Sequence, residues 1–268
     1  MLGSHAVVRG AWLPDGGGMM FRKPGIKGIS LGDRRDLEFA YQAKFSQYAD
    51  VPEVKSLICS PVADQANLGS CGSFASVYHM VSTAVQNDQE PINLSQLFLY
   101  YAYRERYGNV NSDDGVMLRD LLKVLASVGV CREETWPYTL ANWNKKPPPE
   151  AYAEAAQHKI SSYHAIYSAE DMIQCLAAGY GFLGGIGCYE GFDSIYTEKT
   201  GIVEIPKQGE KLLGWHALYF GGGYDLHKGM VKFENSYGPE WGDRGYGWIS
   251  LEYLTSPFLA ADLWTVRA

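Results

Sequence analysis

The sequence predicts an α+β fold in which a mostly helical half precedes a mostly β half. Apolar residues recur at helical spacing between residues 74 and 129, whereas short apolar runs separated by glycine-rich turns fill the chain after residue 180. A proline-rich segment, residues 136–150, lies between the two patterns and is the best candidate for their boundary. With 268 residues, of which 46% are hydrophobic, the chain suffices for one large globular unit or two packed subdomains sharing a cleft.

Three helices are expected in the first half. The first follows from the spacing of Val77, Val81 and Val85 after Phe74. The second covers residues 92–107, with Asn93 or Ser95 as its N-cap and Gly108 as its stop, and the third covers residues 113–128 and ends at Gly129.

The second half is expected to begin with one helix, over residues 169–178, and to continue as strands. The strand-like runs are residues 181–189, 201–205, 216–224, 230–237 and 246–251.

Composition narrows the class of protein. The net charge of -7 provides no basic stripe to neutralise phosphates, so no nucleic-acid partner is expected, and no apolar run has the roughly 20 residues that a membrane span needs. The N-terminus lacks a signal-peptide pattern, which favours the cytoplasm while leaving export by another route open. Five widely spaced cysteines without a Cys-x-x-Cys pair favour free thiols in a reducing compartment, although up to two disulfides remain open. No cofactor is predicted.

The stretch "DQANLGSCGSF", residues 64–74, contains a cysteine with two interpretations. Cys71 is either a nucleophile at a helix start, where oriented backbone amides lower a thiol pKa, or a structural residue beside Phe74. His216 lies in a strand-like run, and Asn235 ends the next run, where its side chain can orient an imidazole. Taken singly, each has an ordinary structural explanation. Together, they predict a thiol–imidazole–amide site.

These residues resemble the papain-like cysteine peptidases, and the bacterial members most of all. The family pattern around the nucleophile is Gln, any two residues, Cys-Gly-Ser-Cys-Trp, any residue, Phe, and "QANLGSCGSF" follows most of it. The run "NSYGPEWGDRGYG" is similar to the family signature around the asparagine, and "LSQLFLYYAYRER" and "GVMLRDLLKVLASVGVCREETWPY" are similar to its helical part. The resemblance implies a papain-like fold with a helical subdomain, an antiparallel β-barrel-like subdomain and the active site in the cleft between them.

The resemblance also implies roles for individual residues. Cys71 is the expected nucleophile, His216 the acid and base, and Asn235 the residue that orients the imidazole. Gln65 decides between the two interpretations of Cys71, because its side-chain amide and the Cys71 backbone N–H then form an oxyanion hole.

Four further residues are expected to bind substrate. The family pairs a Gly-Gly edge with the substrate backbone, and here Gly115 retains the second glycine. Val116 and Met117 are expected to line a pocket that prefers a bulky aliphatic or aromatic side chain, and Trp241 to form part of the primed-side wall. Packing at the start of the third helix is the alternative for Val116 and Met117, and core packing is the alternative for Trp241.

Three departures from the family pattern carry expectations of their own. Leu68 stands in place of a cysteine that makes a disulfide near the site, and its partner has no counterpart either. Gly72 replaces a tryptophan and is expected to leave a roomier wall beside the thiol. Tyr237 replaces a tryptophan that shields the His–Asn hydrogen bond, which predicts weaker positioning of His216.

The leading hypothesis is therefore an endopeptidase that hydrolyses peptide or protein substrates through a Cys71 thioester. An acyl-transferring or amide-processing enzyme on the same residues remains open, as does a binding module with a decayed site. A Cys/His metal site is disfavoured because no third and fourth ligands are evident.

Two regions are expected along the chain. Residues 1–48 form an N-terminal extension and residues 49–268 the catalytic domain, with its helical half at about 60–140 and its β half at about 155–268. Part of residues 1–45 is expected to lie in or near the cleft and to restrain activity.

Overall fold

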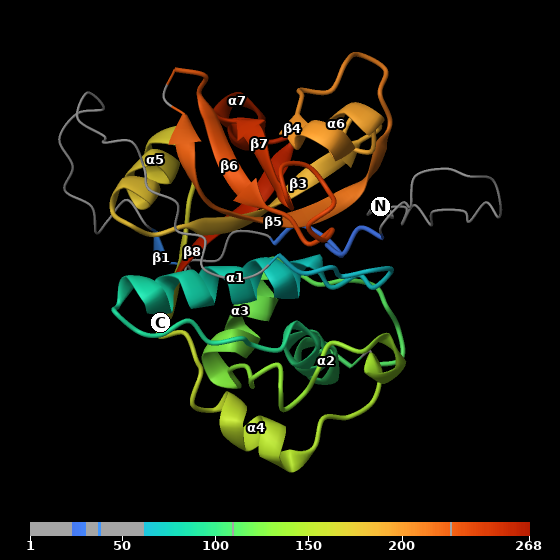
Figure 1. Cartoon of the computed structure of the whole chain (residues 1–268), viewed down its shortest axis with the longest axis vertical. Helices are drawn as coiled ribbons and strands as arrows, with labels where there is room; N and C mark the ends of the chain where they lie inside the picture. Colours follow the sequence, from blue (N-terminus) through green and yellow to red (C-terminus); the bar gives the residue numbers. More distant parts are fainter. Residues whose placement is uncertain (1–22, 31–36, 39–61, 109, 226) are drawn as a thin grey trace, which may run out of the picture.

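A computed structural model describes residues 23–30, 37–38, 62–108, 110–225 and 227–268. Four helices, α1 to α4, gather in one half of the described chain, and a mixed sheet with three short helices forms the other half (Figure 1). This arrangement confirms the α+β fold. Most of residues 1–48, and the boundary at residue 49, lie outside the described residues.

The helical half is built around α1, Cys71–Gln86. This helix is buried from Cys71 to Ala84, because it lies between the other helices and the sheet (Figure 1). The second helix, α2, is Gln96–Arg106, and its N-cap is Ser95, whose hydroxyl accepts a hydrogen bond from the Phe98 N–H at 3.0 Å. The third, α3, is Leu118–Ser127.

The proline-rich segment differs from the expectation of a plain crossing. It contains a 3₁₀ turn, Leu140–Asn142, and a helix, α4, Pro149–Ala155. Pro149 is the first residue of α4, a position that suits proline because its missing N–H would have no partner inside the helix anyway. The prolines therefore begin a helix that the sequence pattern did not reveal.

The sheet has eight strands in the order β1-β2-β8-β3-β5-β6-β7-β4. Its centre is antiparallel, while the pairs β1–β2 and β4–β7 at its two edges are parallel. Over the described residues this order is linear, so the sheet is open at both edges. The strands are β1 Leu37–Glu38, β2 Ser162–Ala165, β3 Phe182–Tyr189, β4 Ile202–Val203, β5 Leu212–Asp225, β6 Met230–Glu234, β7 Tyr246–Ser250 and β8 Ala260–Arg267.

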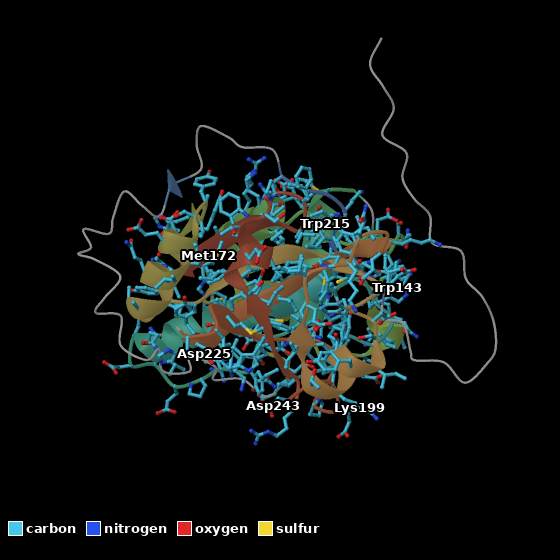
Figure 2. The ribbon with its side chains drawn as sticks, turned by 90° about the horizontal axis from the view of Figure 1, so that it is seen from above. Trp143, Met172, Lys199, Trp215, Asp225 and Asp243 are labelled. Carbon is cyan, nitrogen blue, oxygen red and sulfur yellow. The ribbon has the colours of Figure 1, made fainter. Side chains whose placement is uncertain are left out.

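Three helices complete the β half: α5 Ala169–Ala177, α6 Ile195–Thr200 and α7 Leu251–Thr255. The expected helix corresponds to α5, which begins with a capping box between Ser168 and Asp171. Met172 of α5 lies inside this half, whereas Lys199 and Asp243 lie at its rim (Figure 2). None of the helices in the described part of the chain combines the length and the apolar character needed to cross a bilayer.

Strand β5 connects the two hydrophobic cores because successive side chains point to opposite faces. Ala217 and Tyr219 belong to the core shared with the helices, whereas Leu218 and Phe220 belong to the core on the other face. His216 shares the parity of Leu218. The strand also runs beside α1, so the start of that helix and the middle of β5 face each other (Figure 1).

Candidate active site

Cys71 is the first residue of α1, at the end of a tight turn. The Ser70 N–H donates to the Leu68 carbonyl at 2.8 Å, and the Ser70 carbonyl then accepts from the Ser73 N–H at 2.8 Å. Phe74 lies one turn later and is buried edge-to-face against Tyr138, with ring centroids 5.0 Å apart. The thiol is thus at the helix N-terminus, and Phe74 is part of the core.

His216 and Asn235 come from neighbouring strands. His216 lies within β5, and Asn235 directly follows β6. The Asn235 Oδ1 atom is 2.8 Å from His216 Nε2 and also accepts from the Ser236 N–H at 2.8 Å, which identifies this atom as the oxygen. Nε2 must therefore carry the proton, which leaves the Nδ1 lone pair of the neutral ring as a base. Within the described residues, Nδ1 has no hydrogen-bond partner.

The thiol and the imidazole are brought together by one backbone contact. The Ala217 N–H, one residue after His216, donates to Cys71 Sγ at 3.3 Å. Both side chains are fully buried. The N-terminus of α1 and strand β5 thereby place two of the predicted residues side by side.

An aromatic cluster packs around His216. The Tyr237 ring centroid lies 4.8 Å from that of His216, and the Phe192 centroid lies 5.9 Å away. Trp241 stacks on Phe192 at 6.0 Å and is buried, so the alternative of core packing describes its placement. The sequence did not single out Phe192, because a lone aromatic residue before α6 is indistinguishable from any core residue.

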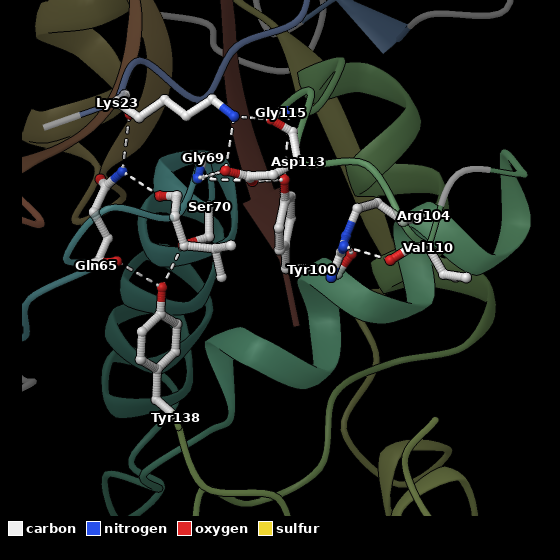
Figure 3. Close-up of polar contacts among 11 residues, drawn as sticks. Lys23, Gln65, Gly69, Ser70, Tyr100, Arg104, Val110, Asp113, Gly115 and Tyr138 are labelled. Carbon is white, nitrogen blue, oxygen red and sulfur yellow. Dashed lines mark hydrogen bonds and ion pairs between the residues drawn. The ribbon is translucent and has the colours of Figure 1, made fainter. Parts of the chain in front are cut away.

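Gln65 is held in place by Ser236, which the sequence analysis also missed. The Ser236 hydroxyl donates to Gln65 Oε1 at 2.6 Å, and the Gln65 N–H donates to the Ser236 carbonyl at 2.8 Å. The amide nitrogen must then face the other way, where Nε2 donates to the Leu68 carbonyl at 2.8 Å and approaches the Lys23 carbonyl at 3.3 Å. This donor points toward the segment that precedes the thiol (Figure 3).

Residues 23–28, here named the strap, cross the site between the helical half and β5 (Figure 1). The Val116 N–H donates to the Gly25 carbonyl and the Lys27 N–H to the Val116 carbonyl, both at 2.8 Å. On the other side, the Ile26 N–H donates to the Trp215 carbonyl at 3.3 Å. The strap is therefore an added strand with a parallel bridge between Ile26 and Val116.

The residue that pairs with the strap is Val116, and the expected pairing of Gly115 with a substrate backbone stays a prediction. Gly115 instead lies against the strap with a φ of 78°, and a Cβ there would come within 2.3 Å of the Gly25 carbonyl oxygen. Met117 also lies beside the strap, since a Cβ on Gly28 would be 3.1 Å from Met117 Sδ.

Gly25 lies directly over the thiol. A Cβ on Gly25 would come within 2.7 Å of Cys71 Sγ and within 2.5 Å of the Gly69 carbonyl oxygen. Its backbone also makes a hydrogen bond to the Cys71 sulfur. Only glycine fits here without displacing the strap.

The wall at Gly72 is filled, contrary to the expectation of a roomier site. A Cβ on Gly72 would lie 2.4 Å from Val116 Cγ2 and 3.1 Å from Leu118 Cδ2. The Val116 side chain is fully buried and points toward α1, which is the packing alternative, while its backbone faces the cleft. The space that the family's tryptophan would occupy beside the thiol is filled here by Val116 and Leu118, at the start of α3.

Burial dominates the ionisation of the pair. It raises the pKa of Cys71 to about 11, against hydrogen bonds from the backbone of Ala217, Gly25 and Gly72, which lower that pKa. It also lowers the pKa of His216 to about 4, against the hydrogen bond to Asn235, which raises it. With the strap in place, burial therefore favours the neutral forms of both the thiol and the imidazole.

The cysteines outside this site are isolated from one another. Cys131, Cys175 and Cys188 are buried and free, while Cys59 lies outside the described residues. In the part of the chain that the structure describes, no group of three or more His, Cys, Asp or Glu side chains is arranged to hold a metal ion.

Comparison with known proteins identifies relatives along most of the chain. The family model described as papain family cysteine protease matches residues 46–255. An uncharacterized peptidase C1-like protein of Acanthamoeba polyphaga mimivirus is 31% identical over 229 residues, which cover 80% of this chain and 73% of the viral protein. The oryzain gamma chain of Oryza sativa subsp. japonica is 23% identical, and the chain spans 55% of its length.

Solved structures agree. Xylellain, a cysteine protease from Xylella fastidiosa, superposes with a TM-score of 0.82 at 28% identity, covering 96% of this chain and 99% of that one. Digestive procathepsin L2 of Tenebrio molitor larval midgut shares the fold with a TM-score of 0.69 at 17% identity, covering 91% of this chain and 78% of that one. In this chain the thiol lies at the helix start, and the strap pairs with the cleft edge at Val116. The family model and the viral relative show that the chain belongs to the papain family of cysteine proteases.

Proposed function

We propose that the chain is an endopeptidase whose reaction is carried out by Cys71, His216, Asn235 and Gln65. One observation carries the proposal: the thiol, the Asn-bound imidazole and the Gln65 amide meet at the start of α1, joined through Ala217 and Ser236. A thiol, a base with a free lone pair and an oriented donor are the groups that acyl transfer needs.

The geometry supports a definite order of events. His216 Nδ1 takes the proton from the Cys71 thiol, and the thiolate attacks the carbonyl carbon of the scissile bond. Gln65 Nε2 and the Cys71 N–H donate to the oxygen that becomes negative. The C–N bond then breaks as the imidazolium gives its proton to the leaving amine. Water, deprotonated by His216, hydrolyses the thioester and releases the acid and the thiol.

The strap supports a preference for an apolar residue in the peptide. Ile26 lies in the cleft as part of an added strand, and a Cβ on Gly185 would come within 2.7 Å of Ile26 Cδ1. Ile26 also packs against the core shared by the two halves. A substrate with a bulky aliphatic or aromatic side chain can occupy the same space.

The strap is also the proposed restraint on activity. It covers Cys71 and uses the backbone groups of Val116 and the Gln65 amide that a substrate would need. Among the solved structures that share the fold, one is a digestive procathepsin L2 and another, the Amb a 11 cysteine protease, is in its proform, which agrees with a cleft-covering segment. We place residues 1–48 in this inhibitory extension and residues 49–268 in the catalytic domain.

Labelling and turnover test the function together. The full chain is incubated with an epoxide thiol inhibitor, the adduct is located by mass spectrometry, and a fluorogenic peptide amide is assayed in parallel. We expect an adduct on Cys71 and turnover that Cys71→Ser lowers by at least about a thousandfold. Cys131→Ala, which removes a buried thiol elsewhere, is expected to keep turnover.

The other outcomes identify the alternatives. An adduct on Cys71 without hydrolysis of any peptide would favour an acyl-transferring enzyme, and transfer to an added amine would then be sought. Folded protein without any adduct on Cys71 would contradict both enzymes and leave a binding module.

A further inference from the structure

Tyr138 joins the residue that carries the proposed oxyanion donor to the residue that precedes the thiol. Its hydroxyl donates to the Gln65 backbone carbonyl at 2.9 Å and lies 2.7 Å from Ser70 Oγ (Figure 3). A phenol has a single proton, so the Ser70 hydroxyl must be the donor in the second contact. These bonds form one directed chain from Ser70 through Tyr138 to Gln65.

The tyrosine is itself held by the helical half. Its backbone N–H donates to Glu133 Oε1 at 2.5 Å, and its ring packs edge-to-face on Phe74 of α1 with centroids 5.0 Å apart. Burial raises the pKa of the Tyr138 hydroxyl well above its usual range. The hydroxyl therefore keeps its proton, and remains a donor to Gln65, at neutral and mildly alkaline pH.

Gln65 is held from both halves of the molecule. Ser236, which follows β6, binds the side-chain oxygen and the backbone N–H of Gln65. On the helical side, the Gln65 carbonyl accepts from Tyr138, and from the Leu68 N–H at the longer distance of 3.3 Å. Without the Tyr138 hydroxyl, Gln65 is held mainly by the β half, while Cys71 stays with α1.

The contacts of Tyr138 also differ from those of the strap. Asp113 accepts the Gly69 N–H with both carboxylate oxygens, at 2.9 and 3.2 Å, and one of these oxygens forms an ion pair with Lys23 of the strap at 2.8 Å. The hydrogen bonds of Tyr138, in contrast, join residues outside the strap. We therefore expect them to persist when the strap leaves the cleft.

We propose that Tyr138 is a positioning residue for the oxyanion hole, whose hydroxyl sets the distance between the Gln65 side-chain amide and the Cys71 N–H without touching the substrate. The inference rests on the proposed function and names a further residue of the same site. Two donors stabilise a developing negative oxygen only when both lie at hydrogen-bond distance from it. A shift of Gln65 relative to α1 therefore weakens the transition state more than the bound substrate.

The test uses Tyr138→Phe, which removes one oxygen atom and keeps the ring on Phe74. Two reagents are compared on the full chain: a peptide aldehyde, whose adduct with the Cys71 thiol places an oxygen in the oxyanion hole, and iodoacetamide, whose adduct does not. Both need the strap to be displaced. The association constant of the aldehyde divided by the rate constant of alkylation therefore does not depend on the fraction of molecules with an open cleft.

We expect this ratio to fall about tenfold in Tyr138→Phe, less than the roughly 10²- to 10³-fold that loss of an oxyanion donor costs. The kcat for a fluorogenic peptide amide is expected to fall by the same factor, while KM changes little. Tyr253→Phe is the matched control, because its buried hydroxyl also donates to a backbone carbonyl, that of Gly187, at 2.5 Å in the β half. We expect this control to keep both the ratio and kcat.

A double variant distinguishes positioning from a general loss of stability. In the Gln65→Ala chain the donor is absent, so the addition of Tyr138→Phe is expected to lower neither the ratio nor kcat any further. A further loss in that chain would overturn the proposal. An unchanged ratio in Tyr138→Phe alone, or an equal fall in Tyr253→Phe, would do the same.

The outcomes also separate this proposal from the proposed function. If the chain hydrolysed no peptide but its aldehyde binding fell in Tyr138→Phe, Tyr138 would be retained and the endopeptidase contradicted. Hydrolysis that Tyr138→Phe left unaffected would retain the endopeptidase and contradict the role of Tyr138. An unaltered chain that neither bound the aldehyde nor hydrolysed a peptide would contradict both.

Discussion

The thiol and the imidazole are both buried, but they are covered in different ways. His216 is covered by Phe192 and Tyr237, which belong to the β half and pack with Trp241 into its core. Cys71 is covered by Gly25 of the strap, which reaches the site by backbone hydrogen bonds and the Lys23 ion pair. The cover of the imidazole is part of the fold, whereas that of the thiol is an added strand. We therefore expect the base to keep its position when the strap is displaced, and the access of water to the nucleophile to depend on the strap.

The largest expected effect comes from removing the adjustable cover. Gly25→Val places side-chain atoms where Cys71 Sγ and the Gly69 carbonyl already lie, so the strap must leave. Hydration of the thiol then removes the main cause of its raised pKa, which falls from about 11 toward the ordinary value. At pH 8 the thiolate fraction, and with it the rate of alkylation by iodoacetamide, is expected to rise by about 100-fold.

The matched control for this variant is Gly28→Ala. It lies in the same strap, but its Cβ meets only the flexible Met117 side chain at 3.1 Å. We expect its alkylation profile to follow that of the unaltered chain. An unchanged pH profile in Gly25→Val would mean that the strap does not control the ionisation of Cys71.

A smaller effect is expected on the permanent side. Asn235→Ala removes the acceptor at Nε2 but leaves Phe192 and Tyr237 around the ring. The lost hydrogen bond corresponds to about 1.5–3 kcal/mol, or roughly a 10- to 150-fold decrease in kcat with little change in KM. It also removes the interaction that raises the pKa of His216, so that pKa is expected to fall further below about 4.

Titration of the His216 ring, followed by NMR, checks whether its pKa falls in Asn235→Ala. Asn235→Gln, which retains an amide oxygen on a longer side chain, is the comparison variant, and partial recovery of kcat is expected. A decrease larger than about a thousandfold would indicate that the aromatic cover alone does not hold the ring.

The smallest effect on turnover is expected at Gly72, where a substitution distinguishes an open wall beside the thiol from a filled one. Gly72→Ala would stabilise the protein by about 1 kcal/mol in an open helix site. Here its Cβ meets Val116 Cγ2 at 2.4 Å, so we expect a loss of about 1–3 kcal/mol in the free energy of unfolding. Denaturant unfolding measures it, and the double variant Gly72→Ala/Val116→Ala is expected to recover stability relative to the sum of the two single changes. If Gly72→Ala alone raised the free energy of unfolding, the wall beside Gly72 would be open and not filled.

The sequence was most informative where a property depends on neighbouring residues. Helix α2 with its Ser95 cap, the start of α1 at Cys71 and the strands around His216 and Asn235 follow from local patterns. Elements such as α4 and β8 were missed, because α4 begins at a proline and β8 becomes a strand only beside β2 and β3. The roles of the four catalytic residues stay predictions until they are tested.

Tertiary contacts explain the rest of the differences. The strap lies within the range expected to cover the cleft, but no pattern in residues 23–28 shows which of them faces the thiol. Likewise, the filled wall at Gly72 depends on Val116, which is far along the chain. Phe192 likewise contributes to the site only through His216 and Trp241, which folding brings next to it.

Ser236 links the two parts of the candidate active site. Its backbone N–H holds the Asn235 oxygen and its hydroxyl holds the Gln65 oxygen, so one residue aligns both the proton-transfer side and the charge-stabilising side. Both sides of the site are therefore held by the same residue. A substitution of Ser236 removes the hydroxyl that holds Gln65 and keeps the backbone N–H that holds Asn235, so the charge-stabilising side can change while the imidazole keeps its partner. A shift of the backbone at this residue, in contrast, would displace both sides together.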